Sequence, residues 1–199
     1  MRGNLLSACR TACAALLVFT VLTGAAYPCA VTVLARLLFP REANGSLLAV
    51  KGRIVGSSLI GQQFSDPRYF WGRPSATTPF PCNAAASGGS NLGPTNPALM
   101  EAASERIDAL RAANPDYALP IPGDLATASG SGLDPHISPQ AAECQASRVA
   151  KTRGLAVEEV KHLVNTQVEE RTWGVLGEPR VNVLRLNLAL DKMGIAHSE

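Results

Sequence analysis

The hydropathy pattern separates a long uncharged stretch near the N-terminus from the rest of the chain. From Thr11 to Ala35 there are 25 consecutive residues without a charged side chain. As an α-helix this stretch would be about 37 Å long, which exceeds the ~30 Å hydrocarbon core of a bilayer. We therefore expect a transmembrane helix over residues 11–35, within an N-terminal segment of residues 1–36, and a single globular domain over residues 37–199.

A cleaved signal peptide is the alternative explanation of the apolar stretch. Arg2 and Arg10 precede it, and the small residues 24–26 offer a cleavage point. The apolar character continues through residues 31–35, beyond that point, which favours a helix that stays attached. Pro28 predicts a kink near the far end of this helix. Basic residues occur on both sides of the stretch, so counting charges does not orient it.

Two segments of the domain show the alternation of apolar and polar residues that is typical of strands. Residues 46–62 predict a β-hairpin that turns at Lys51 and Gly52. Residues 180–190 alternate only in part, so we expect this segment to begin as a strand and to finish as a helix.

Three further segments have apolar residues at the three- and four-residue spacing of amphipathic helices. Two of them begin with a capping residue followed by proline, at Asn96-Pro97 and at Ser138-Pro139. Pro115 ends the first pattern and Gly154 ends the second. The third helix is expected from Val157 onwards, with acidic residues in its first turn.

Turn-forming residues fill the space between these elements. The chain has 17 glycines and 14 prolines, many of them in residues 84–97 and 115–137. These two segments predict long loops with few backbone groups in regular ladders. The expected fold class is α+β: one N-terminal transmembrane helix, then one domain with a small β-sheet, several amphipathic helices and long Gly/Pro-rich loops.

The distribution of charge argues against nucleic-acid binding. Three of the 18 basic residues lie in residues 1–36, so residues 37–199 carry 15 basic and 16 acidic side chains. A domain with this balance has no basic stripe of the kind that binds phosphate backbones.

The cysteines of the domain leave two possibilities open. Cys82 and Cys144 lack the paired spacing of a zinc site or a redox dithiol. They form a disulfide or remain two isolated thiols, and the spacing does not decide between these.

The sequence SGSGLDPH contains the residue types of a hydrolytic triad. Ser131, Asp134 and His136 supply a nucleophile, an acid and a base. However, a nucleophile elbow requires G-x-S-x-G, and Ser129 occupies the position of the first glycine. Triad residues also come from distant segments as a rule, so we predict no catalytic residue here.

Other catalytic motifs are missing from the sequence. No segment matches the phosphate-binding pattern G-x-x-x-x-G-K-[ST], and the glycines of SGGSNLG at 87–93 suit a turn. The histidines at 136, 162 and 197 are scattered and form no metal-binding pattern. We predict neither a metal site nor a cofactor of the chain's own.

The polar loops and the aromatic cluster supply candidate contacts with a partner protein. Residues 64–80 hold five of the ten aromatic side chains, an arrangement that serves either partner docking or the core of an aromatic-poor domain. From this cluster and the two glycine-containing loops, the expected partner contacts are Tyr69, Phe70, Trp71, Arg73, Ser90, Asn91, Asp134 and His136.

Five stretches of the sequence together resemble one known family. They are GSSLIGQQF (56–64), YFWGRPSA (69–76), SGGSNLGPTNP (87–97), SGSGLDPHISP (129–139) and GEPRVNVLRLNLALD (177–191). In this order they resemble the C subunit of the bacterial Kdp potassium-transporting ATPase. The resemblance extends from the apolar helix to Asp191, although residues 77–86 match no pattern of the family.

This resemblance implies a non-catalytic accessory subunit in a high-affinity potassium uptake complex. The implied partners are a potassium-selective channel-like subunit, a P-type ATPase subunit and a small hydrophobic subunit. The family places the N-terminus in the cytoplasm and the domain outside the inner membrane. It also implies a catalytic chaperone that raises the ATPase subunit's affinity for ATP, with Gln145 matching a glutamine assigned to nucleotide contact and ATP bound by the ATPase subunit or shared with it.

Two other functions are weighed against this one. The first is a membrane-tethered extracytoplasmic hydrolase that uses Ser131 and His136, and the second is a stand-alone binding module. Turnover of ester or peptide substrates would identify the hydrolase, whereas copurification with two large membrane proteins would separate the subunit from the stand-alone module.

Overall fold

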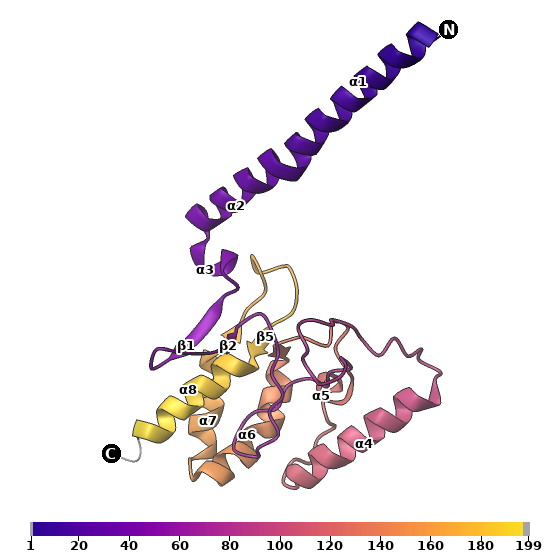
Figure 1. The fold of residues 1–199 in the computed structure, drawn as a ribbon. Coiled ribbons are helices and arrows are strands. Elements are labelled where there is room, and N and C mark those ends of the chain that lie inside the picture. Colours follow the sequence, from indigo (N-terminus) through magenta and orange to yellow (C-terminus); the bar gives the residue numbers. More distant parts are fainter. Residues whose placement is uncertain (1, 197–199) are drawn as a thin grey trace. The chain divides into compact units, whose positions relative to one another are not determined.

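The computed structural model describes residues 2–196 and divides the chain into two compact units (Figure 1). The first unit is Met1–Leu47 and the second is Leu48–Glu199. His197, one of the three histidines considered above, lies outside the described residues.

The N-terminal unit is one long apolar helix followed by a short one. It comprises α1 (Arg2–Val21), a π-helical turn η1 (Leu22–Ala26), α2 (Tyr27–Leu38) and α3 (Pro40–Ala43). The apolar part runs from Leu5 to Leu38, 34 residues with a mean hydropathy of 2.0, and is long enough to cross a bilayer. The expected span of residues 11–35 lies within it.

The predicted irregularity near Pro28 takes the form of the π-helical turn. Pro28 has no N–H to donate to the preceding turn. Before it, the N–H of Tyr27 donates to the carbonyl of Leu22, five residues back, which is the spacing of a π-helix. The helix therefore widens locally, over one π-helical turn, and continues without a break.

The second unit has the predicted α+β composition. Its elements are β1 (Leu47–Val50), β2 (Arg53–Ser57), α4 (Pro97–Ala113), α5 (Gly123–Ala126), β3 (His136–Ile137), α6 (Pro139–Arg153), α7 (Val157–Thr166), β4 (Val168–Glu169), β5 (Arg180–Asn182) and α8 (Val183–Ala196). Strands β1 and β2 form the predicted hairpin, and β3, β5 and β4 form an antiparallel sheet in that order. The one small sheet that we expected is therefore two sheets.

Local signals in the sequence set the ends of the helices as predicted. Asn96 accepts a hydrogen bond from the N–H of Ala98 at 3.0 Å and starts α4, and Ser138 accepts from Ala141 at 3.1 Å and starts α6. Gly154 ends α6 in the left-handed conformation at φ 68°. The segment from residue 180 begins as β5 and continues as α8.

The core lies between α6, α7, α8 and β5, which Figure 1 shows next to one another. Helix α6 contributes mainly alanines to it, and small side chains let neighbouring helices approach closely. Larger buried side chains come from the other elements and from the loops: Phe70, Leu110, Leu125, Ile137, Val160, Val164, Val181, Leu186 and Leu190.

Residues 67–71 cross this core without forming a strand. Side chains of two helices form the hydrogen bonds that their backbone N–H and carbonyl groups need. The amide of Asn187 in α8 accepts from Phe70 N–H at 2.9 Å and donates to Phe70 carbonyl at 3.0 Å. The amide of Gln145 in α6 does the same for Trp71, at 2.8 and 3.1 Å. Each side-chain amide thus takes the place of a neighbouring strand.

Arg148 completes this arrangement from the next turn of α6. The residue is 6% exposed, and its guanidinium donates to the carbonyls of Pro67 and Tyr69, to Gln145 Oε1 at 2.7 Å and to Asn114 Oδ1 at 3.1 Å. Burial lowers the pKa of Arg148 to about 10, yet the group keeps its charge at neutral pH. Neutral oxygens therefore solvate a buried cation.

The long loops are bound to one another by hydrogen bonds from backbone and side chain. Gly88 N–H donates to Ser131 carbonyl at 2.9 Å, and Ser75 Oγ donates to Gly132 carbonyl at 2.7 Å. Gly132 has φ +66°, and a Cβ there would lie 2.5 Å from Thr77 Cγ2 and 2.6 Å from Gly88 O. Only glycine fits this crossing.

Gln145→Met should lower the free energy of unfolding by about 2 to 4 kcal/mol, because it leaves the N–H and carbonyl of Trp71 buried without partners. Urea unfolding of the full chain in detergent micelles measures the change. Gln140→Met, on an exposed position of the same helix, should change stability by less than about 0.5 kcal/mol. Equal stability of the two variants would contradict the conclusion that the hydrogen bonds of Gln145 to Trp71 stabilise the fold.

Gly132→Ala should destabilise the domain by about 2 kcal/mol or more, since alanine is strained at positive φ and its methyl group meets backbone. Gly130→Ala is the matched control, because a Cβ at Gly130 meets nothing within 4 Å. Thermal unfolding of the two variants should separate them clearly. A melting temperature equally unchanged in both would show that the loop crossing is not tight.

Candidate functional site

The aromatic cluster splits between the core and the surface. Phe70, one of the expected partner contacts, has no exposed surface, so this expectation is corrected: its side chain belongs to the core. Tyr69 and Trp71 are half-buried neighbours. The guanidinium of Arg153 lies 4.7 Å from the ring centroid of Tyr69, and that of Arg148 lies 4.2 Å from the ring centroid of Trp71.

Three of the predicted contact residues, Arg73, Asp134 and His136, belong to one row of side chains joined by polar contacts. Arg73 Nη1 lies 3.1 Å from Asp134 Oδ2, and His136 Nδ1 lies 3.4 Å from Asp134 Oδ1. His136 Nε2 faces Glu169 at 3.9 Å, and Glu169 in turn pairs with Arg185 at 2.8 Å. This row of contacts connects the aromatic segment, β3, β4 and the start of α8.

The environment of Asp134 favours its charged form. Partial burial raises the pKa of this carboxyl group, but hydrogen bonds with the side chain and backbone of His136 and with Arg73 outweigh the burial, so that its pKa lies below the ordinary value. Asp134 therefore acts as a fixed anion that orients Arg73 and His136. Ser90 and Asn91, the other polar candidates, are exposed in their loop.

The geometry does not assemble a hydrolytic triad from these residues. Ser131 Oγ accepts the N–H of Leu133 at 3.1 Å, as in a local turn. Both ring nitrogens of His136 face carboxylates, those of Asp134 and Glu169. Within residues 2–196 no hydrogen bond joins Ser131 to His136, so the base has no nucleophile to activate.

Neither a disulfide nor a metal-binding group forms among the described residues. Cys82 and Cys144 are both free thiols, which settles the alternative left open by the sequence. Burial raises the pKa of Cys144 to about 11, so this thiol is inert at neutral pH. No group of three His, Cys, Asp or Glu side chains comes together in the described part of the chain.

Gln145 is not accessible to a nucleotide in this structure. Its side chain has no exposed surface, and its amide is bonded to Trp71, Ala141 and Arg148. The amide has a structural role here, because all its hydrogen bonds are formed in the core. The nucleotide contact implied by the resemblance stays a prediction.

An exposed apolar loop at residues 171–178 is the feature that the sequence analysis missed. Trp173 is 86% exposed, Val175 72% and Leu176 53%. Thr172 and Leu176 exchange backbone hydrogen bonds of 2.9 and 3.0 Å, and an ion pair of 2.6 Å joins Arg171 to Glu178 at the base. The sequence signal was Trp173 followed by two aliphatic residues between Gly174 and Gly177, outside any periodic segment.

Comparison with known proteins places the chain in a family. Residues 9–192 match the family KdpC, described as the K⁺-transporting ATPase c chain. The potassium-transporting ATPase KdpC subunit of Herpetosiphon aurantiacus is 64% identical over 184 residues, which cover 92% of this chain and 95% of that protein. The KdpC subunit of Sorangium cellulosum is 62% identical over 182 residues, covering 92% and 96%.

A third relative, the KdpC subunit of Dechloromonas aromatica, is 59% identical over 184 residues, covering 92% of this chain and 96% of that protein. The family match extends from residue 9 in α1 to residue 192 in α8, in agreement with the resemblance read from the five stretches. With its single apolar helix, the chain is a membrane-associated subunit. The chain belongs to the KdpC family, the c chains of potassium-transporting ATPases.

Proposed function

We propose that this chain is a non-catalytic accessory subunit of a high-affinity, ATP-driven potassium uptake complex, and that its main task is to hold the assembled complex together. Its partners in this proposal are a potassium-selective channel-like subunit, a P-type ATPase subunit and a small hydrophobic subunit. Family membership supports the complex as a whole, and the exposed surface of the domain supports the assembly role.

The observation that carries the proposal is the apolar loop 171–178. A large aromatic and two aliphatic side chains in water are unfavourable for an isolated domain, and such exposed patches mark contact surfaces. Two backbone hydrogen bonds between Thr172 and Leu176 close the loop, and the exposed ion pair at its base adds little to them. A preformed loop loses little entropy when it binds, so the contact gains affinity.

The remaining candidates, half-buried or exposed, are proposed to extend this contact. Tyr69 and Trp71 lie in segment 67–71, Arg73 follows it, and Asp134 pairs with both Arg73 and His136. Together with Ser90 and Asn91 they offer polar groups that suit the rim of an interface, while the apolar loop suits its centre. The proposed occupant is the potassium-selective subunit.

In this proposal ATP binds to the ATPase subunit, and the c chain raises ATP affinity through assembly. The complete burial of Gln145 supports an indirect effect over a shared nucleotide site. Family resemblance supports a topology in which the N-terminus is cytoplasmic and residues 37–199 lie outside the inner membrane, with residues 11–35 retained as the anchor. A domain on that side is separated from cytoplasmic ATP by the bilayer.

Replacing Trp173 and Leu176 together by serine should reduce copurification with the large subunits at least tenfold, because aromatic and aliphatic anchors dominate interface energies. Met100→Ser with Leu119→Ser is the matched control, since these side chains are 66% and 65% exposed and lie outside the loop. The control should assemble normally. Full assembly and normal potassium-stimulated ATPase activity in the loop variant would contradict the assembly role of the loop.

The topology is tested with a single reporter cysteine. In a chain whose five cysteines are replaced by serine, Met100→Cys should react with a membrane-impermeant maleimide in intact cells, because this position is exposed on the domain. The cysteine-free parent is the control for background labelling. Labelling that occurs only after lysis would place the domain in the cytoplasm.

A further inference from the structure

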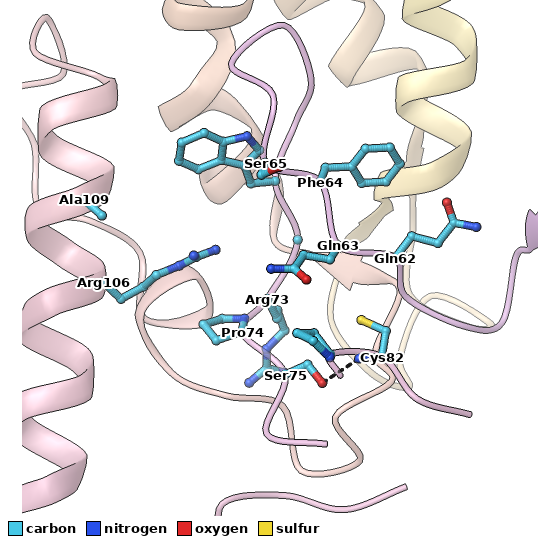
Figure 2. A pocket seen from close by; sticks show the side chains of 13 residues that line it. Gln62, Gln63, Phe64, Ser65, Arg73, Pro74, Ser75, Cys82, Arg106 and Ala109 are labelled. Atoms are coloured by element: carbon cyan, nitrogen blue, oxygen red, sulfur yellow. Dashed lines mark hydrogen bonds between the residues drawn. The ribbon is translucent and has the colours of Figure 1, made fainter. Parts of the chain in front are cut away.

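A cavity of about 320 Å³ lies between α4 and the aromatic segment (Figure 2). Residues 62–65 and 71–75 form one wall, Pro81 and Cys82 close one end, and Arg106 and Ala109 of α4 form the opposite wall. The volume equals roughly ten water molecules at about 30 Å³ each, enough for a small organic ion. The cavity is separate from the apolar loop 171–178.

Two arginines give this cavity its charge. Arg73 and Arg106 both line it, whereas none of the described lining residues is an aspartate or a glutamate. Figure 2 shows Arg106 extending from α4 toward the segment that carries Gln63 and Arg73. A polar cavity with two cations and no acid in its wall is complementary to an anion.

Both arginines also have unused hydrogen-bond donors. The Nε atoms of Arg73 and Arg106 are buried and have no hydrogen-bond partner among the described residues. Arg73 is nevertheless compensated in charge, since its Nη1 pairs with Asp134 at 3.1 Å outside the cavity wall. Arg106 takes part in no ion pair of the described structure, so the site has one uncompensated positive charge.

The surroundings of Arg106 leave part of its guanidinium without a partner. The side chain is half-buried, and this partial burial lowers the pKa of the guanidinium, while its buried Nε has no hydrogen-bond partner among the described residues. Arg148, by comparison, is buried among four oxygen acceptors. The guanidinium of Arg106 lies beside the cavity without an ion-pair partner in the described part of the chain. The ligand that complements it is an anion that accepts its hydrogen bonds.

We propose that the cavity between Arg73 and Arg106 binds a carboxylate. One uncompensated positive charge matches one negative charge, and a guanidinium presents two parallel N–H groups to a carboxylate. Gln63 and Ser65, on the same wall as Arg73, add neutral polar groups to the site. The carboxylate comes from one of two sources, a small acid free in solution or an acidic side chain of a neighbouring subunit.

The first arm of the test uses the full chain alone in detergent and does not rest on the proposed function. Isothermal titration with sodium propionate, at an ionic strength held constant with sodium chloride, should show saturable binding. Arg106→Gln should weaken it at least tenfold, and Arg106→Lys should weaken it less, because lysine keeps the charge without the fork. Arg111→Gln, an exposed arginine of the same helix, should change it less than twofold.

The second arm tests the neighbouring-subunit source and rests on the proposed function. If the carboxylate belongs to another subunit, the chain alone binds propionate weakly, while Arg106→Gln reduces copurification at least tenfold and Arg111→Gln does not. Loss of assembly in the Trp173 and Leu176 variant with normal propionate binding would support the pocket independently of that interface. Binding of phosphate but not of propionate would overturn the carboxylate assignment.

Stability without any ligand separates a binding role from a structural one. A half-buried cation without an ion-pair partner adds little to stability, so Arg106→Gln should unfold at the same temperature as the unaltered chain or higher. A clearly lower melting temperature without propionate would show that Arg106 holds the fold, and the proposal would fail. It would fail equally if Arg106→Gln changed neither propionate binding nor assembly.

Discussion

The fold depends on how the backbone of residues 67–71 is satisfied inside the core. This segment carries Phe70 into the core without a neighbouring strand, and buried peptide groups without partners are strongly unfavourable. The amides of Gln145 and Asn187 and the guanidinium of Arg148 supply the missing hydrogen bonds. Helices α6 and α8 are thereby fixed to the same stretch of chain, and the position of the neighbouring residues 71–75 follows from this.

The part of the fold that sequence could predict is the part decided within a few residues. The caps Asn96 and Ser138, the prolines after them and Gly154 each act on adjacent backbone groups, and the structure confirms these helix ends. The bracing of Trp71 by Gln145 joins residues 74 positions apart, and no spacing rule reports such a contact. Strands β3 and β4 have two residues each, too few to show a period.

The candidate site was predicted unevenly for the same reason. Arg73, Asp134 and His136 do come together, but neighbouring aromatic residues in one run gave no sign that Phe70 is buried while Trp71 reaches the surface. The resemblance assigns Gln145 to nucleotide contact, while its buried amide bonds the backbone in the core. Arg106 lies in an ordinary amphipathic helix, and nothing in the sequence indicates that its guanidinium has no ion-pair partner among the described residues. In both cases the decision lies in tertiary contacts, which local pattern does not contain.

The π-helical turn of the apolar helix divides it into two differently oriented halves. One additional residue in a turn rotates everything beyond it by about 100° relative to an uninterrupted α-helix. A row of side chains on one side of α1 therefore does not continue along the same side of α2. Any neighbouring helix that follows a straight line across the bilayer meets one surface of Arg2–Val21 and a different surface of Tyr27–Leu38. The same side of the bilayer span is therefore lined by different rows of side chains before and after the π-helical turn.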